Sequence, residues 1–95
     1  MVQAMLSDMV VVITGGAGFL GSQFCAAVAE HGGTAVVADI DIEAATRVAK
    51  EISATHPSRA EAVLLDITSQ DSVSSLIEKL HERYGRIDAV VSNAY

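Results

Sequence analysis

The chain has 95 residues, 51% of them hydrophobic, which suits one compact domain and excludes a disordered chain. Its formal net charge is −6, and its six basic residues are scattered along the sequence, which argues against a nucleic-acid partner. A single cysteine excludes an internal disulfide, and the first apolar run (residues 9–14) is too short for a membrane span or signal peptide, so we expect a cytoplasmic protein.

Apolar runs and helical repeats alternate along the chain after a loose leader at residues 1–8. The first strand is expected at 9–14, and a helix at about 18–31 follows it. A second strand at 35–39 leads to a helix at about 42–55, and a third strand covers 60–66. Thr68 or Ser69 can cap a third helix that ends at Tyr84 and Gly85, and a fourth strand covers 87–92.

The spacing of apolar residues predicts which side of each helix faces the core. The inward side chains are expected to be Leu20, Phe24, Ala27 and Val28 in the first helix, Ala45, Val48, Ala49 and Ile52 in the second, and Val73, Leu76, Ile77 and Leu80 in the third. Cys25 is expected to be a small apolar filler.

Continuous apolar strands separated by helices predict an α/β fold with a parallel sheet covered on both faces. Right-handed crossovers then place the fourth strand on the far side of the first, giving the order 3-2-1-4. This is the first half of a Rossmann-type doubly wound sheet. Residues 9–95 are therefore expected to form the N-terminal part of a dinucleotide-binding domain that is truncated after its fourth strand.

A glycine-rich turn between the first strand and the first helix is the strongest functional signal. Gly15 permits the chain reversal, Gly18 permits close approach to a pyrophosphate, and Gly21 permits close packing of helix and sheet. Asp39 follows the second strand, 18 residues after Gly21, near the spacing of an acid that binds an adenosine ribose. A simpler interpretation is that Asp39 and Asp41 favour the positive end of the second helix.

The sequence resembles the short-chain dehydrogenase/reductase family from Val10 to Tyr95. The resemblance is carried by the segment from Thr14 to Gly21, by Asp39, by the run Leu65-Asp66-Ile67-Thr68, and by the run Ser92-Asn93-Ala94-Tyr95. It implies that Asp66 and its neighbour Ile67 contact adenine, and that Asn93 and Ala94 support the central strand and the nicotinamide ribose. The expected cofactor-binding residues are Gly15, Gly18, Phe19, Leu20, Gly21, Asp39, Ile40, Asp66, Ile67, Asn93 and Ala94.

Two departures from the family pattern leave alternatives open. The glycine spacing T-G-x-x-G-x-x-G is similar to that of the longer branch, which contains nucleotide-sugar epimerases and dehydratases, whereas the later motifs resemble the shorter oxidoreductase branch. Tyr95 stands where glycine is usual, as in a subgroup associated with sugar modification. A stand-alone, non-catalytic NAD-binding module is the third alternative.

The resemblance implies hydride transfer between a nicotinamide cofactor and a carbonyl or alcohol substrate. NAD is favoured over NADP because Asp39 would repel a 2′-phosphate and no Lys or Arg lies between Gly15 and Asp39. The family's serine and Tyr-x-x-x-Lys pair are absent, since Tyr84 is followed four positions later by Asp88. We therefore expect no catalytic residue and no metal site in this chain, a substrate bound through a missing C-terminal half, and a parent enzyme that forms homo-oligomers.

Overall fold

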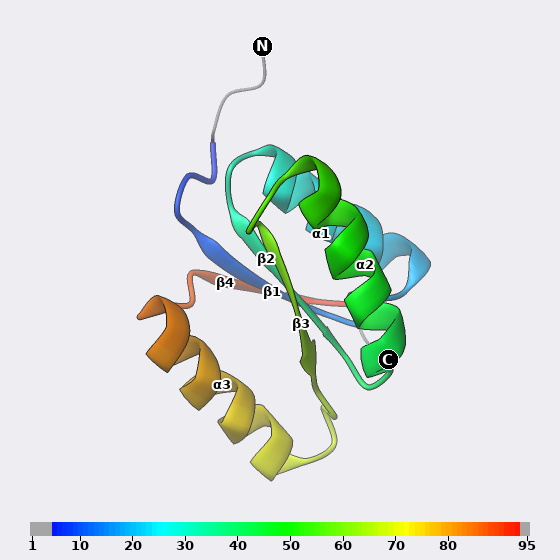
Figure 1. Cartoon of the computed structure of the whole chain (residues 1–95). Helices are drawn as coiled ribbons and strands as arrows, with labels where there is room; N and C mark the ends of the chain where they lie inside the picture. The colour runs from blue at the N-terminus through cyan, green and yellow to red at the C-terminus, as the bar shows by residue number, and fades with distance from the viewer. Residues whose placement is uncertain (1–4, 94–95) are drawn as a thin grey trace.

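A computed structural model describes residues 5–93 as four parallel strands and three helices (Figure 1). In chain order the elements are β1 (Val10–Thr14), α1 (Phe19–Glu30), β2 (Thr34–Asp39), α2 (Ile42–Thr55), β3 (Ala60–Leu64), α3 (Gln70–Tyr84) and β4 (Ala89–Ser92). The strands lie in the order β3-β2-β1-β4 and all pair in parallel. The predicted Rossmann-type topology is confirmed, and β1 lies at the point where the strand order reverses.

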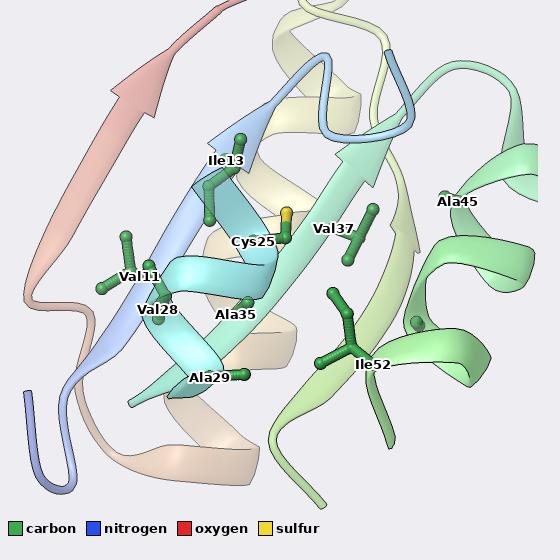
Figure 2. Packing of buried hydrophobic residues seen from close by; sticks show 10 residues of the cluster. Val11, Ile13, Cys25, Val28, Ala29, Ala35, Val37, Ala45 and Ile52 are labelled. Atoms are coloured by element: carbon green, nitrogen blue, oxygen red, sulfur yellow. The ribbon is translucent and has the colours of Figure 1, made fainter. Parts of the chain in front are cut away.

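The sheet separates two apolar clusters. On one face α1 and α2 cover the sheet, and Figure 2 shows Cys25 of α1 between Ile13 of β1 and Val37 of β2. Burial raises the pKa of the Cys25 thiol to about 12, consistent with the predicted apolar filler. On the other face α3 packs Leu76 and Leu80 against β1, β2 and β3.

The predicted inward face of α1 is wrong by one position. Leu20 and Phe24 are 53% and 41% exposed, and Ala27 is also exposed, whereas Gly21 and Cys25 are buried. Burial of Gly21 sets this rotation, because only a residue without a side chain allows the first turn of α1 to approach the glycine-rich turn this closely. Leu20, Phe24 and Ala27 therefore lie on an uncovered side of the helix, whereas Val28 is buried, as predicted.

Helix α2 buries Ala45, Ala49 and Ile52 and half-buries Val48, as predicted. In α3 the prediction fails for Ile77, which is 50% exposed, whereas Leu76 and Leu80 are buried and Val73 is partly buried, as predicted. Several element ends also differ from the sequence prediction by one or two residues: β1, α1 and β4 are shorter than expected, β2 begins one residue earlier, and β3 ends at Leu64 instead of residue 66. Ser69, not Thr68, caps α3, accepting a hydrogen bond from the backbone N–H of Ser72 at 3.1 Å.

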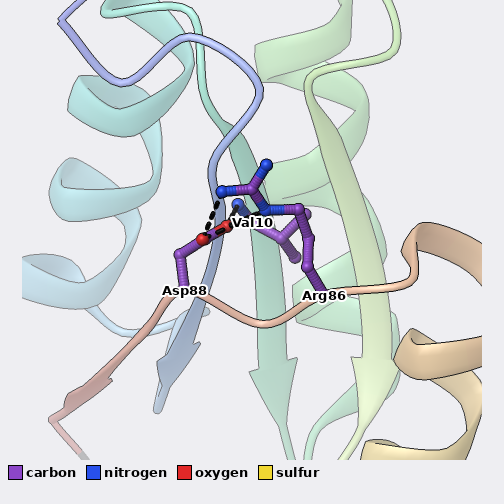
Figure 3. Close-up of polar contacts among 3 residues, drawn as sticks. All are labelled: Val10, Arg86 and Asp88. Carbon is purple, nitrogen blue, oxygen red and sulfur yellow. Dashed lines mark hydrogen bonds and ion pairs between the residues drawn. The ribbon is translucent and has the colours of Figure 1, made fainter.

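Asp88 joins the entrance of β4 to the beginning of β1 (Figure 3). Its Oδ2 accepts a hydrogen bond from Val10 N–H at 2.7 Å, and its own N–H donates to Val10 O at 2.9 Å. The Arg86 guanidinium donates to both carboxylate oxygens, over 2.6 to 3.0 Å. Hydrogen bonds from Arg86 and then from Val10 hold the pKa of the Asp88 carboxyl below its ordinary value.

The end of the expected leader is attached to the domain. Leu6 N–H donates to His31 O at 2.9 Å, and the Leu6 side chain packs against the cluster beneath α1. Within residues 5–93 no helix is long and apolar enough to cross a membrane.

Candidate dinucleotide-binding site

The candidate residues gather at the carboxyl edge of the sheet. Gly15 follows β1, Asp39 ends β2, Asp66 lies two residues beyond β3, and Asn93 follows β4. Because all four strands are parallel, these residues meet at one edge, around the point where the strand order reverses. Ligands of open α/β sheets bind in this crevice.

The glycine turn (residues 15–18) and Gly21 show separable reasons for glycine. Gly15 has a φ of +65°, in the left-handed region. A Cβ on Gly21 would lie 2.2 Å from Gly15 O and 2.9 Å from Asn93 Nδ2, so the fold itself requires glycine there. A Cβ on Gly18 would meet nothing closer than Gly15 O at 3.4 Å. No contact inside the described chain demands glycine at position 18, and its predicted role in the approach of a pyrophosphate stays a prediction.

The N-terminus of α1 is open to an anion. Gly18 is the N-cap, and within the described residues no side chain caps this end and no acidic residue occupies the first turn. The N–H groups of the first turn have no acceptor inside a helix, and they carry the positive end of the helix dipole. Phe19 is 84% exposed and Leu20 is half-exposed, so neither side chain shields these groups. The arrangement suits a phosphate or pyrophosphate.

Asp39 and Asp41 have different partners. Asp41 caps α2 by accepting a hydrogen bond from Ala44 N–H at 3.1 Å. Asp39 instead accepts one from Ala17 N–H in the glycine turn through Oδ2 and one from Asp41 N–H through Oδ1, each at 3.0 Å. The cap of α2 is therefore Asp41, and the Asp39 carboxylate faces the candidate site.

A pocket of about 190 Å³ lies between the ends of β1, β2 and β3. It is lined by Gly15, Ala38, Asp39, Ile40, Leu65, Asp66, Ile67 and Thr68. Ile40 and Ile67 are 66% and 48% exposed, and with Leu65 they offer apolar surface to a flat ring. The lining includes two carboxylates, Asp39 and Asp66, and no Lys or Arg side chain.

Thr68 holds the Asp66 carboxylate. Its N–H and hydroxyl donate to Asp66 Oδ1 at 3.0 and 2.6 Å, and these hydrogen bonds lower the pKa of Asp66. Within residues 5–93, Asp66 Oδ2 accepts no hydrogen bond, so an ionised oxygen is available to an amino group such as that of adenine.

Asn93 connects β4 to the glycine-rich segment. Its N–H donates to Thr14 Oγ1 at 3.0 Å, and the Thr14 hydroxyl donates to Val91 O at 3.3 Å. The Asn93 side chain lies directly beside Gly21. Ala94 lies outside the described residues.

Three residues of this edge were missed by the sequence reasoning: Thr14, Gly16 and Ala17. A Cβ on Gly16 would lie 2.9 Å from Ile13 O and 3.0 Å from Val37 Cγ1, so this glycine packs the turn onto β2. The pair Gly15-Gly16 in the sequence could have indicated this close packing of Gly16. Ala17 takes part through its backbone N–H, which no sequence pattern marks.

Tyr84 has no place in the candidate site. Its hydroxyl donates to Glu61 Oε1 at 2.6 Å, and burial together with this bond raises the pKa of Tyr84 to about 12. Burial also raises the pKa of Glu61, but hydrogen bonds from Arg83 and Tyr84 outweigh it, so the Glu61 pKa lies below its ordinary value. A larger cavity of about 600 Å³ lies beside these residues at the free edge of β3, away from the glycine turn. In the part of the chain that the structure describes, no group of three His, Cys, Asp or Glu residues could hold a metal ion.

Comparison with known proteins identifies the family. The family model for short chain dehydrogenases matches residues 9–94. The chain belongs to the short-chain dehydrogenase/reductase family. An uncharacterized oxidoreductase, YuxG, of Bacillus subtilis is 44% identical over 93 residues, which cover 97% of this chain and 14% of that protein. Galactitol 2-dehydrogenase of Agrobacterium fabrum is 37% identical over 89 residues, which cover 94% of this chain and 33% of that enzyme.

Solved structures of dehydrogenases and oxidoreductases have the same fold as this chain. A hydroxysteroid dehydrogenase from Escherichia coli superposes with a TM-score of 0.89 at 32% identity, over 97% of this chain and 39% of that one. An oxidoreductase from Haemophilus influenza with bound NAD has a TM-score of 0.83 at 25% identity, over 90% of this chain and 30% of that one. A metagenomic short-chain oxidoreductase in complex with NADP has a TM-score of 0.87 at 28% identity, over 94% of this chain and 40% of that one. The chain thus spans between a seventh and two fifths of these proteins. Their names do not favour the epimerase or non-catalytic alternatives.

Proposed function

We propose that this chain is the NAD-binding portion of a short-chain oxidoreductase and that NAD is preferred over NADP. The observation that carries the proposal is the Asp39 carboxylate, which lines the pocket at the end of β2 beside the glycine turn. Two of its lone-pair positions are used by backbone N–H groups, and the others can accept hydrogen bonds from ribose hydroxyls. A 2′-phosphate there would meet this carboxylate without a cation among the lining residues.

The remaining residues fit the rest of the dinucleotide. The uncapped N-terminus of α1 would bind the pyrophosphate, and Ile40 and Ile67 would flank the adenine. The adenine amino group would donate a hydrogen bond to Asp66 Oδ2. NAD supplies hydride chemistry when bound. This chain's residues bind and orient its adenosine and pyrophosphate parts.

Hydride exchange with a carbonyl or alcohol would require residues that this sequence lacks, since no Tyr-x-x-x-Lys pair occurs in it. We propose that further polypeptide supplies them and extends the sheet beyond β4. Support comes from exposed apolar side chains: Val90 on the edge strand β4 is 61% exposed, and Leu20 of α1 and Ile77 of α3 are about half-exposed. A sugar-related alcohol is the first substrate class to test, because galactitol 2-dehydrogenase is among the relatives. A reducing, cytoplasmic setting suits the single buried Cys25.

Thermal unfolding with NAD or NADP tests the cofactor. At ten times its Kd, NAD should raise the unfolding free energy by about 1.4 kcal/mol, which corresponds to a Tm shift of roughly 6–11 °C. Asp39→Ala should weaken NAD binding about ten- to a hundredfold and reduce the discrimination against NADP. Asp41→Asn is the matched control, because it removes a nearby charge and keeps a capping side chain. Equal shifts with NAD and NADP in the unmodified protein would refute the preference.

A further inference from the structure

The Asp39 carboxylate bonds to the glycine turn as well as facing the pocket. Ala17 N–H donates to Asp39 Oδ2 at 3.0 Å, across 22 residues of sequence. The residue that would recognise the ribose therefore also contacts Ala17, which immediately precedes Gly18, the N-cap of α1. Resting on the function proposed above, we propose that Asp39 is a positioning residue for the phosphate-binding turn, which orients the first N–H groups of α1 toward a pyrophosphate.

The other contacts of the turn leave this task to Asp39. Gly16 N–H donates to Ala38 O at 3.1 Å, and the Gly16 backbone packs against Val37, so the first half of the turn is fixed on β2. Gly18 N–H donates back to Gly15 O at 3.1 Å, which closes the turn on itself. Within the described residues, Asp39 is the side chain whose hydrogen bond connects the second half of the turn to the sheet.

Charge and positioning predict opposite changes in pyrophosphate affinity when Asp39 is removed. A carboxylate this close to the N-terminus of α1 repels a bound anion, so charge alone predicts that removing Asp39 strengthens pyrophosphate binding. Positioning predicts the opposite, because a loosened turn no longer presents its N–H groups together.

Inorganic pyrophosphate is the discriminating probe because it has no ribose and no adenine. Its affinity can be measured from the amide chemical shifts of residues 19–21 during a titration. Asp39→Ala should bind pyrophosphate about fivefold more weakly than the unmodified protein, the size of one ordinary hydrogen bond. Asp41→Asn is the matched control: it removes a carboxylate charge next to Asp39 and keeps a capping side chain for α2. Asp39→Ala binding pyrophosphate as tightly as Asp41→Asn would overturn the proposal.

Amide hydrogen exchange in the unmodified protein keeps the proposal testable if Asp39→Ala does not fold. The Ala17 amide should exchange at least tenfold more slowly than the amides of Phe19 and Leu20, for which residues 5–93 provide no acceptor. Equal exchange at these positions would overturn the role of Asp39. Failure of the folded, unmodified protein to bind either NAD or pyrophosphate would instead refute the proposed function, so the two failures are distinguishable.

Discussion

Gly18 and Gly21 allow one substitution, glycine to alanine, to be compared at two positions of the same segment. In Gly21→Ala the new Cβ would lie 2.2 Å from Gly15 O and 2.9 Å from both Gly16 Cα and Asn93 Nδ2. Two of these three atoms belong to the backbone, so rotation of a side chain cannot relieve the overlap. Either α1 or the glycine turn must move.

The expected magnitude is a balance of two effects. Alanine inside a helix is favoured over glycine by about 1 kcal/mol. Overpacking of a tight contact costs about 1–3 kcal/mol and more where backbone must shift. We expect Gly21→Ala to lower the free energy of unfolding by about 2 kcal/mol net, which for a domain of this size corresponds to a Tm decrease of roughly 8–16 °C.

Gly18→Ala should behave differently. Gly18 has a φ of −74° and a ψ of 174°, which alanine adopts without strain, and its Cβ would meet only ordinary contact distances. Its stability should remain within about 0.5 kcal/mol of the unmodified protein. Its affinity for NAD should fall, because the methyl group occupies space that we assign to the pyrophosphate.

Urea unfolding followed by circular dichroism, with and without NAD, measures both quantities. The reasoning requires Gly21→Ala to lose stability and Gly18→Ala to lose the NAD-dependent increase. A Gly21→Ala protein at least as stable as the unmodified one would refute the packing argument. A Gly18→Ala protein that binds NAD normally would refute the ligand argument and leave the packing argument intact.

Three further predictions concern the rest of the domain. Asp88→Ala should lower Tm more than Asp88→Asn, because asparagine retains an acceptor for the buried Val10 N–H. The pKa of Asp88 is lowered from 3.8, so the stability that its carboxylate contributes is present above that value and is lost as pH falls below it. Acid unfolding of the unmodified protein and both variants checks the sign, because the variants should lack this loss. The pKa of Tyr84 is raised from 10 to about 12, so the stability that its hydroxyl contributes is present below pH 10 and is lost as pH rises toward 12. Tyr84→Phe should therefore lose less stability than the unmodified protein at alkaline pH. An equal loss would contradict the role given to the Tyr84 hydroxyl. Val90→Lys should change the free energy of unfolding by no more than about 0.5 kcal/mol and reduce self-association in light scattering, because Val90 is 61% exposed on an edge strand; a large loss of stability would show that Val90 is already covered.

Sequence reasoning predicted topology better than helix rotation. Alternating apolar runs determine the order of elements, and α2 begins and ends at the predicted residues 42 and 55. The inward face of α1 could not be read from hydrophobicity, because the residue that controls its rotation is Gly21, which adds no apolar side chain. Ile77 was misplaced because helical spacing includes it, whereas Leu76 and Leu80 are the residues of α3 that the structure buries.

In the candidate site, some residues could be predicted from the sequence, whereas the contacts between them could not. Gly15 and Asp39 were predicted from the glycine turn and the spacing that follows it, and Asp66 from the family resemblance. The structure brings all three to one pocket. Their individual roles remain predictions. The contact of Asp39 with Ala17 could not be predicted, because it depends on the backbone path of the turn. That path follows from left-handed Gly15 and from the packing of Gly16 on Val37.

The described residues contribute more candidate contacts to one side of the dinucleotide crevice than to the other. On the β2 and β3 side of β1 they form a pocket with two carboxylates and exposed isoleucines, whereas on the β4 side Asn93 is the candidate that they contribute. If the proposed assignment is correct, most of the binding energy available to this chain comes from the ADP portion of NAD. ADP-ribose should then bind to the 95-residue chain within about threefold of NAD, a difference below 0.7 kcal/mol, in parallel calorimetric titrations. An NAD affinity more than tenfold above that of ADP-ribose would mean that residues of this chain also hold the nicotinamide side.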